Sequence, residues 1–163
     1  MTRKFFLILA CVLVGFFIEL FLFNIVGRLF LPNLLILLVI CFNIFLGIRY
    51  SLFTAVVAGL LKDSFSISPF GVYLFSFVAA AFITTVLKRY IYHRGSRFSL
   101  LLLTLLVLLI NGLVHFLIAV MLGQVEAAQV VKFIFVPEIL STVVVANFVF
   151  YQLKTCVLKF SVL

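Results

Sequence analysis

The sequence has few of the residues from which catalytic and metal sites are built. Its 163 residues include four acidic side chains, two histidines and three cysteines. The cysteines (Cys11, Cys41 and Cys156) fall within or at the ends of apolar runs, and their spacing predicts neither a metal motif nor a disulfide framework. No Gly-rich phosphate loop or recognisable Ser/His/Asp or Cys/His arrangement occurs. We therefore expect no catalytic residue, no cofactor and no metal ion.

What the chain has in excess is apolar surface. Apolar residues make up 67% of it and charged residues only 10%. A chain of this size leaves much of its surface exposed after folding, so a water-soluble fold could not hide so many apolar side chains. The composition predicts an all-α, polytopic integral membrane protein: a single helical domain over residues 1–163, with little mass outside the bilayer.

Six apolar runs are candidates for membrane-spanning helices, each of which needs about 20 residues. They are Phe5 to Phe23, Leu29 to Gly47, Ile48 to Leu61, Phe70 to Leu87, Phe98 to Leu122 and Phe133 to Leu153. The first run is long, contains Glu19 and lacks a small-x-small cleavage site, so we expect a retained helix rather than a signal peptide. The third run is short. It is either a short crossing or a half-helix completed by non-helical backbone.

The basic residues favour six crossings with both termini in the cytoplasm, because cytoplasmic loops are rich in Lys and Arg. This topology places these nine residues inside: Arg3, Lys4, Arg49, Lys88, Arg89, Arg94, Arg97, Lys154 and Lys159. Only three lie outside: Arg28, Lys62 and Lys132. If the third run did not cross, the basic segment 88–97 would fall outside. The net charge of +8 thus indicates topology and contact with anionic membrane lipids rather than nucleic-acid binding.

Small residues at helical spacing predict where two helices pack closely. The third and fourth runs each carry three of them at i, i+4 and i+8, which places each set on one helix face. The sets are Ser51, Ala55 and Gly59, and Ser76, Ala80 and Thr84. Lipid provides no hydrophobic force between helices, so small residues and hydrogen bonds determine close packing. We expect these two helices to form a tight hairpin.

Polar side chains at membrane depth predict a second feature. Such residues usually face the interior of a helical bundle. We expect a cluster of Glu19, Asn111, His115 and Glu138 in the outer half of the membrane, since Asn111 and His115 share a face and Glu19 lies at a similar depth. The cluster could hold the bundle together, contact a partner's helix, or bind a ligand or proton.

The segment from Gly59 to Leu74 is the most specific stretch of the chain. It predicts a helix end, a short outer loop and a new helix start. Asp63 can accept hydrogen bonds from loop amides, and Ser68 followed by Pro69 is typical of a helix N-terminus. Gly71 allows another backbone to come close.

This segment also resembles the rod shape-determining protein MreD family. The family pattern is a Gly-Leu-x-x-Asp helix end followed by a Leu/Phe-Gly helix start, which matches Gly59, Leu60, Asp63, Phe70 and Gly71 here. Pro32, before an apolar run, resembles the proline that opens the family's second helix. The resemblance covers residues 30–75 in motif and nearly the whole chain in length and order of helices.

The resemblance implies a non-enzymatic scaffold in the bacterial inner membrane that belongs to the cell-elongation complex (the elongasome). Its partners would be the membrane helix of MreC and, indirectly, cytoskeletal MreB, the RodA glycosyltransferase and a class B penicillin-binding protein, which build peptidoglycan. Because the motif lies there, we expect a partner interface among these residues: Ser51, Ala55, Gly59, Asp63, Pro69, Gly71, Ser76 and Ala80.

We also consider two functions other than that of a scaffold. The alternative is the substrate-binding membrane subunit of a small-solute, vitamin-type transporter, which the outer polar cluster would suit. Against it, such subunits present an Ala-x-x-x-Ala face on their first helix, where this chain offers only Ala10. A membrane-embedded enzyme would need clustered acidic and histidine residues in its loops, and the loops hold too few.

Overall fold

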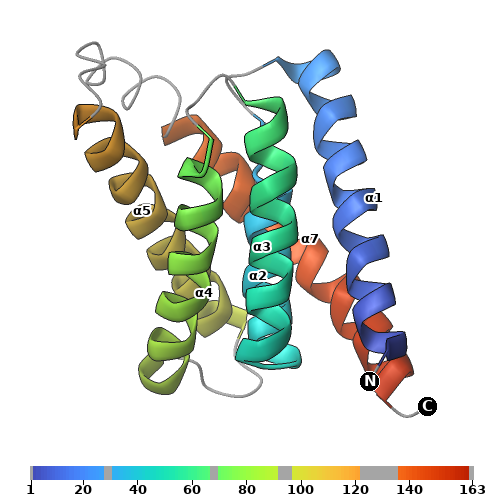
Figure 1. The fold of residues 1–163 in the computed structure, drawn as a ribbon. Coiled ribbons are helices and arrows are strands. Elements are labelled where there is room, and N and C mark those ends of the chain that lie inside the picture. The colour runs from blue at the N-terminus through green and yellow to red at the C-terminus, as the bar shows by residue number, and fades with distance from the viewer. Residues whose placement is uncertain (1, 28–30, 67–69, 92–96, 122–135, 162–163) are drawn as a thin grey trace.

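Helices make up most of the chain, as Figure 1 shows for a computed structural model that describes residues 2–27, 31–66, 70–91, 97–121 and 136–161. These residues form six helices and no strand, which confirms the all-α prediction. The helices are α1 (Thr2–Val26), α2 (Leu34–Phe45), α3 (Ile48–Phe65), α4 (Val72–Ile91), α5 (Arg97–Met121) and α7 (Val136–Ser161). Among the described helices, α1, α4 and α5 contain segments long and apolar enough to cross a membrane.

Helix α2 lies at the centre of the bundle. Every residue from Leu34 to Ile44 is buried, and α2 packs against α1, α3, α4 and α7. Either protein or lipid can cover a helix as apolar as α2, and the hydrogen bonds of Asn33 and Asn43 to other helices favour the position inside the bundle. The other helices follow one another around α2 in the order α1, α3, α4, α5 and α7, each packed on the next.

The short helix is the second, not the third. The prediction placed the short crossing at Ile48 to Leu61, but α3 has 18 residues and α2 only 12. Two features shorten α2: it begins only after Pro32 and Asn33, and it ends before a turn at Gly47. Helix α3 is longer than predicted because Lys62 and Asp63 remain helical and find partners within the bundle. A short α2 is possible because protein, rather than lipid, surrounds it.

The C-terminal end of α2 is held by α4. Gly47 adopts a φ of 97°, which favours glycine, and lets the chain reverse directly into α3. The amine of Lys88 donates to the carbonyl oxygens of Asn43 at 3.1 Å and Ile44 at 2.8 Å. The Asn43 side chain donates to the carbonyl oxygen of Ala81 at 2.8 Å. The Lys88 amine thus satisfies the Ile44 carbonyl, which lies in the last turn of α2 beyond the reach of a helical N–H, and it adds a second bond to the Asn43 carbonyl, which also accepts from the N–H of Gly47.

The predicted hairpin of α3 and α4 is present, and these two helices make the most extensive contact in the bundle. They lie side by side and run in opposite directions (Figure 1). Gly59 marks the closest approach, because a Cβ atom built there would lie 2.5 Å from Cα of Leu74. The two small-residue stripes also serve other neighbours. Ser51 donates to the carbonyl of Val39 in α2 at 2.9 Å, and Ser76 donates to Asn111 in α5.

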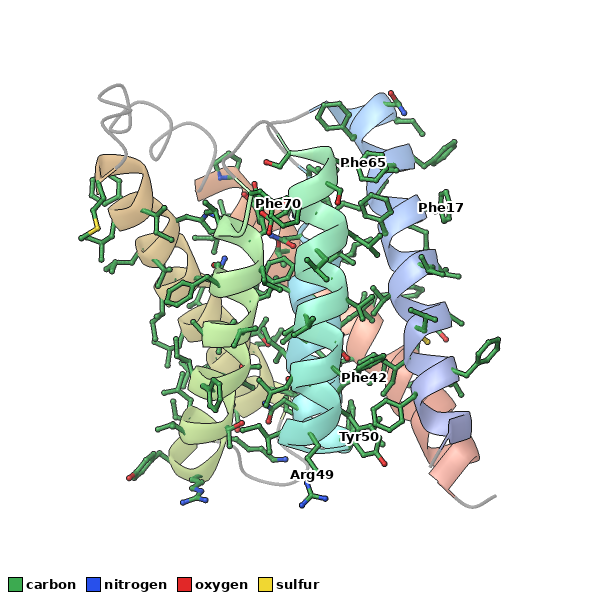
Figure 2. All side chains as sticks on the ribbon, viewed as in Figure 1. Phe17, Phe42, Arg49, Tyr50, Phe65 and Phe70 are labelled. Carbon is green, nitrogen blue, oxygen red and sulfur yellow. The ribbon has the colours of Figure 1, made fainter. Side chains whose placement is uncertain are left out.

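The outer surface of the bundle is apolar. Figure 2 labels Phe17, Phe65, Phe70 and Phe42 and shows Phe17 pointing away from the bundle. The exposed fractions of the first three are 66%, 68% and 71%, whereas Phe42 is fully buried. A belt of exposed aromatic and aliphatic side chains is the surface that a lipid-embedded protein requires.

Candidate functional site

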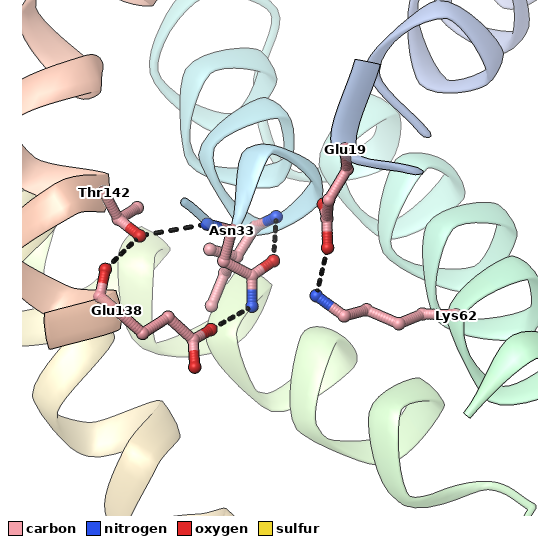
Figure 3. A network of polar contacts seen from close by, with 6 residues as sticks. Glu19, Asn33, Lys62, Glu138 and Thr142 are labelled. Carbon is pink, nitrogen blue, oxygen red and sulfur yellow. Dashed lines mark hydrogen bonds and ion pairs between the residues drawn. The ribbon is translucent and has the colours of Figure 1, made fainter. Parts of the chain in front are cut away.

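The main polar site lies where α1 and α3 end and where α2 and α7 begin (Figure 3). Its central contact is an ion pair between Lys62 Nζ in α3 and Glu19 Oε1 in α1, 2.6 Å apart. Glu19 is 6% exposed, and its second carboxylate oxygen, Oε2, is buried without a hydrogen-bond partner among the described residues. The Lys62 ammonium also lies 5.3 Å from the ring centroid of Tyr73, a cation–π contact.

The other half of the polar site joins α2 to α7 through Asn33. The Asn33 side chain donates to Glu138 Oε1 at 3.0 Å, and its backbone N–H donates to Thr142 Oγ1 at 3.0 Å. The same side chain accepts from the N–H of Ile36 at 3.4 Å and so caps α2. Figure 3 shows Asn33 between Glu138 and the pair of Glu19 and Lys62, so the two halves adjoin each other. This polar site therefore ties α1, α2, α3 and α7 together.

Asp63 connects α3 to α4. Its carboxylate oxygens accept hydrogen bonds from the backbone N–H groups of Tyr73 and Leu74, each at 3.0 Å. These N–H groups belong to the first turn of α4, where no helical carbonyl is available and a negative charge is favourable. The N-terminus of α4 had been predicted at Ser68 and Pro69. Both lie outside the described residues, and α4 begins at Val72, after Gly71 with a φ of 101°.

The predicted intramembrane cluster is distributed over several contacts. The structure pairs Glu19 with Lys62 and Glu138 with Asn33. Asn111 accepts from Ser76, and the ring of His115 lies 4.7 Å from that of Tyr73, centroid to centroid. Because Tyr73 also lies beneath the Lys62 ammonium, His115 adjoins the same polar site.

The predicted partner-interface residues lie mostly inside the bundle. Their burial places them in contacts within the chain, and any contact with a partner stays a prediction. Buried ones are Ser51, Ala55, Gly59, Asp63, Ser76 and Ala80. Gly71 is half-buried, and Pro69 lies outside the described residues.

Sequence reasoning missed three residues of the polar site: Lys62, Asn33 and Thr142. It assigned Lys62 to an outer loop as a topology charge. The position of Lys62 next to Asp63, one turn after Gly59, was a signal that both polar residues could still belong to the helix. Asn33, directly after Pro32, had the pattern of a helix N-cap.

Together, the apolar outer surface, the fully buried α2 and the paired polar groups define a helical-bundle membrane protein. Over residues 1–159, nearly the whole chain, the sequence matches the family described as rod shape-determining protein MreD, and the chain belongs to that family. The resemblance seen in the Gly59 to Leu74 segment is thus confirmed, and the chain has a role in determining rod shape. No curated protein and no solved structure matches the chain.

Proposed function

We propose that the chain is a non-enzymatic, multi-pass scaffold of the cell-elongation complex in the bacterial inner membrane. It docks the membrane helix of MreC and so connects cytoskeletal MreB to peptidoglycan synthesis by RodA and a class B penicillin-binding protein. The family match over residues 1–159 carries this proposal. It extends the family's role in shape determination to specific partners.

The proposed topology has six crossings in one membrane domain, with both termini in the cytoplasm. Six helices that alternate in direction support it, because α1 begins on the same side of the bundle as α7 ends (Figure 1). Arg49 and Arg89 lie at that side, as the excess of positive charge in cytoplasmic loops requires.

The pairing of polar groups favours a scaffold over a transporter subunit. A solute site needs polar side chains that are available to a ligand. Here Glu19, Asn33, Lys62, Asp63 and Asn111 already bond to other residues of the chain. Their bonds join helices, which is the function of polar groups in a rigid membrane bundle.

Depletion of the protein in its native bacterium, with recovery of MreC on a tagged copy, tests the proposal. We expect cells to widen or become round, and MreC to co-purify with the tagged chain. Cells of normal shape without recovered MreC would contradict the scaffold. A screen of small solutes for a ligand-induced rise in melting temperature would then test the transporter alternative.

A further inference from the structure

The described asparagine side chains differ in their burial and in their hydrogen-bond partners. Asn33, Asn43 and Asn111 are buried, and each bonds to another helix. Asn24 is exposed, and it donates to the carbonyl of Leu20 in its own helix at 3.1 Å. Asn147 is exposed and makes no hydrogen bond to any described residue.

Asn147 lies within an otherwise apolar face of α7. The exposed neighbours on this face are Leu140, Val144, Phe148 and Tyr151, with exposed fractions between 62% and 76%. The opposite face, with Thr142, Ala146 and Phe150, is buried against the bundle. We call the exposed set, together with Asn147, the outward face of α7.

The depth of Asn147 makes an unpaired amide unfavourable. It lies near the middle of α7, about 16 Å along the axis from Val136 and about 21 Å from Ser161 at ~1.5 Å per residue. A side chain of this length cannot reach the headgroups from there. The hydrocarbon core offers neither donors nor acceptors, so a polar group in it needs a protein partner.

We propose that the outward face of α7 binds a single membrane-spanning helix of another protein, whose Asn, Gln, Ser or Thr side chain pairs with Asn147. An amide both donates and accepts, so it is complementary to each of these side chains. Hydrogen bonds of this kind stabilise helix pairs in lipid. The inference rests on the proposed function, in which MreC supplies such a helix.

We assign the occupant to a different protein rather than a second copy because, in the part of the chain that the structure describes, the segments that join α2, α3 and α4 are too short to form a domain outside the membrane. Two residues separate α2 from α3, and six separate α3 from α4. In the proposed function this chain acts on peptidoglycan synthesis through MreC, so the occupant is that protein. Only the membrane anchor of that protein can reach Asn147.

Site-specific photo-crosslinking in the native membrane tests the location. A benzophenone amino acid replaces Phe148 on the outward face of α7. Matched controls place it at Phe82 in α4 and at Phe17 in α1, which are also exposed phenylalanines. We expect the probe at 148 to capture MreC and the probes at 82 and 17 to capture none.

Substitution of Asn147 tests the hydrogen bond. We expect Asn147→Leu to lower the recovery of MreC roughly 3- to 10-fold, the effect of losing one interhelical hydrogen bond in lipid. Asn147→Gln keeps an amide and should retain most of the recovery. Both variants should melt in detergent like the parent protein, because Asn147 has no partner among the described residues.

The outcomes separate the inference from the proposed function. If MreC is recovered but crosslinks only at residue 82 or 17, or if Asn147→Leu recovers as much as the parent, the proposed function stands and this site is wrong. Capture of a second copy at residue 148 would also overturn the inference. If the parent protein recovers no MreC and depletion leaves cell shape unchanged, the proposed function itself fails.

Discussion

Lys62 in α3 and Glu19 in α1 form an ion pair of 2.6 Å at the main polar site. Helix α1 packs on α2 and α3, so the pair fixes a helix on the border of the bundle. Both side chains are mostly removed from solvent, with exposed fractions of 17% and 8%. A charge in such a place is tolerated only while its counterion is present.

Glu19→Gln should therefore lower the melting temperature in detergent. The substitution leaves the Lys62 ammonium without its counterion, at a cost of about 1–3 kcal/mol, discounted for the residual exposure of Lys62. Lys62→Met should destabilise to a similar degree. The double variant should recover part of the loss, since replacing a buried pair with neutral groups is often tolerated. Losses that simply add in the double variant would show that the pair contributes no coupling.

Asp63→Ala should destabilise the hairpin of α3 and α4. It removes the acceptor for two N–H groups in the first turn of α4, a loss of about 1–2 kcal/mol. Thermal unfolding in detergent measures the effect. Ser64→Ala is the control, because the exposed Ser64 side chain, among the described residues, bonds to the Leu60 carbonyl of its own helix alone. Equal melting temperatures for the two variants would contradict the capping role of Asp63.

Two glycines allow a matched test of close packing. A Cβ atom at Gly59 would lie 2.5 Å from Cα of Leu74, which is backbone and cannot give way. A Cβ at Gly15 would lie 2.9 Å from Cδ1 of Leu38, the end of a flexible side chain. We expect Gly59→Ala to reduce the yield of folded protein strongly, with a loss of about 1–3 kcal/mol from overpacking. Gly15→Ala should be tolerated. Similar yields would mean that α3 and α4 can move apart without cost.

Much of the fold follows from local patterns in the sequence. The stripes around Ala55 and Ala80 are governed by helical periodicity alone, so the pairing of α3 with α4 was predictable. The structural roles of Gly59 and Asp63 in the family motif were predictable for the same reason. Both residues contact the start of α4, which is close to them in the chain.

The sequence was less informative about contacts between helices distant in the chain. The ends of α2 depend on a lysine in α4 and on a threonine in α7, and an apolar run cannot indicate such partners. The prediction therefore assigned the short length to α3, whereas α2 is the short helix. It also grouped polar residues by depth, whereas the pairs in the structure depend on which helices are neighbours. Asn111, for example, faces Ser76 in α4 rather than Glu19.

Lys88 and Arg89 provide the last prediction, because they are adjacent in sequence and differ in role. Each contributes one positive charge to the proposed cytoplasmic side, so topology alone predicts equal effects for Lys88→Met and Arg89→Met. The structure predicts a difference. Lys88 donates to two carbonyls at the end of α2, whereas Arg89 is exposed.

Lys88→Met should lower thermal stability in detergent by about 1–3 kcal/mol, since it leaves the buried Ile44 carbonyl without its partner and removes one of the two bonds to the Asn43 carbonyl. Arg89→Met should change it by less than about 0.5 kcal/mol, as surface substitutions usually do. Cysteine accessibility from each side of the membrane should show the same topology for both variants. Equal stability of the two variants would mean that the hydrogen bonds of Lys88 do not stabilise the protein. Other contacts would then have to stabilise the end of α2.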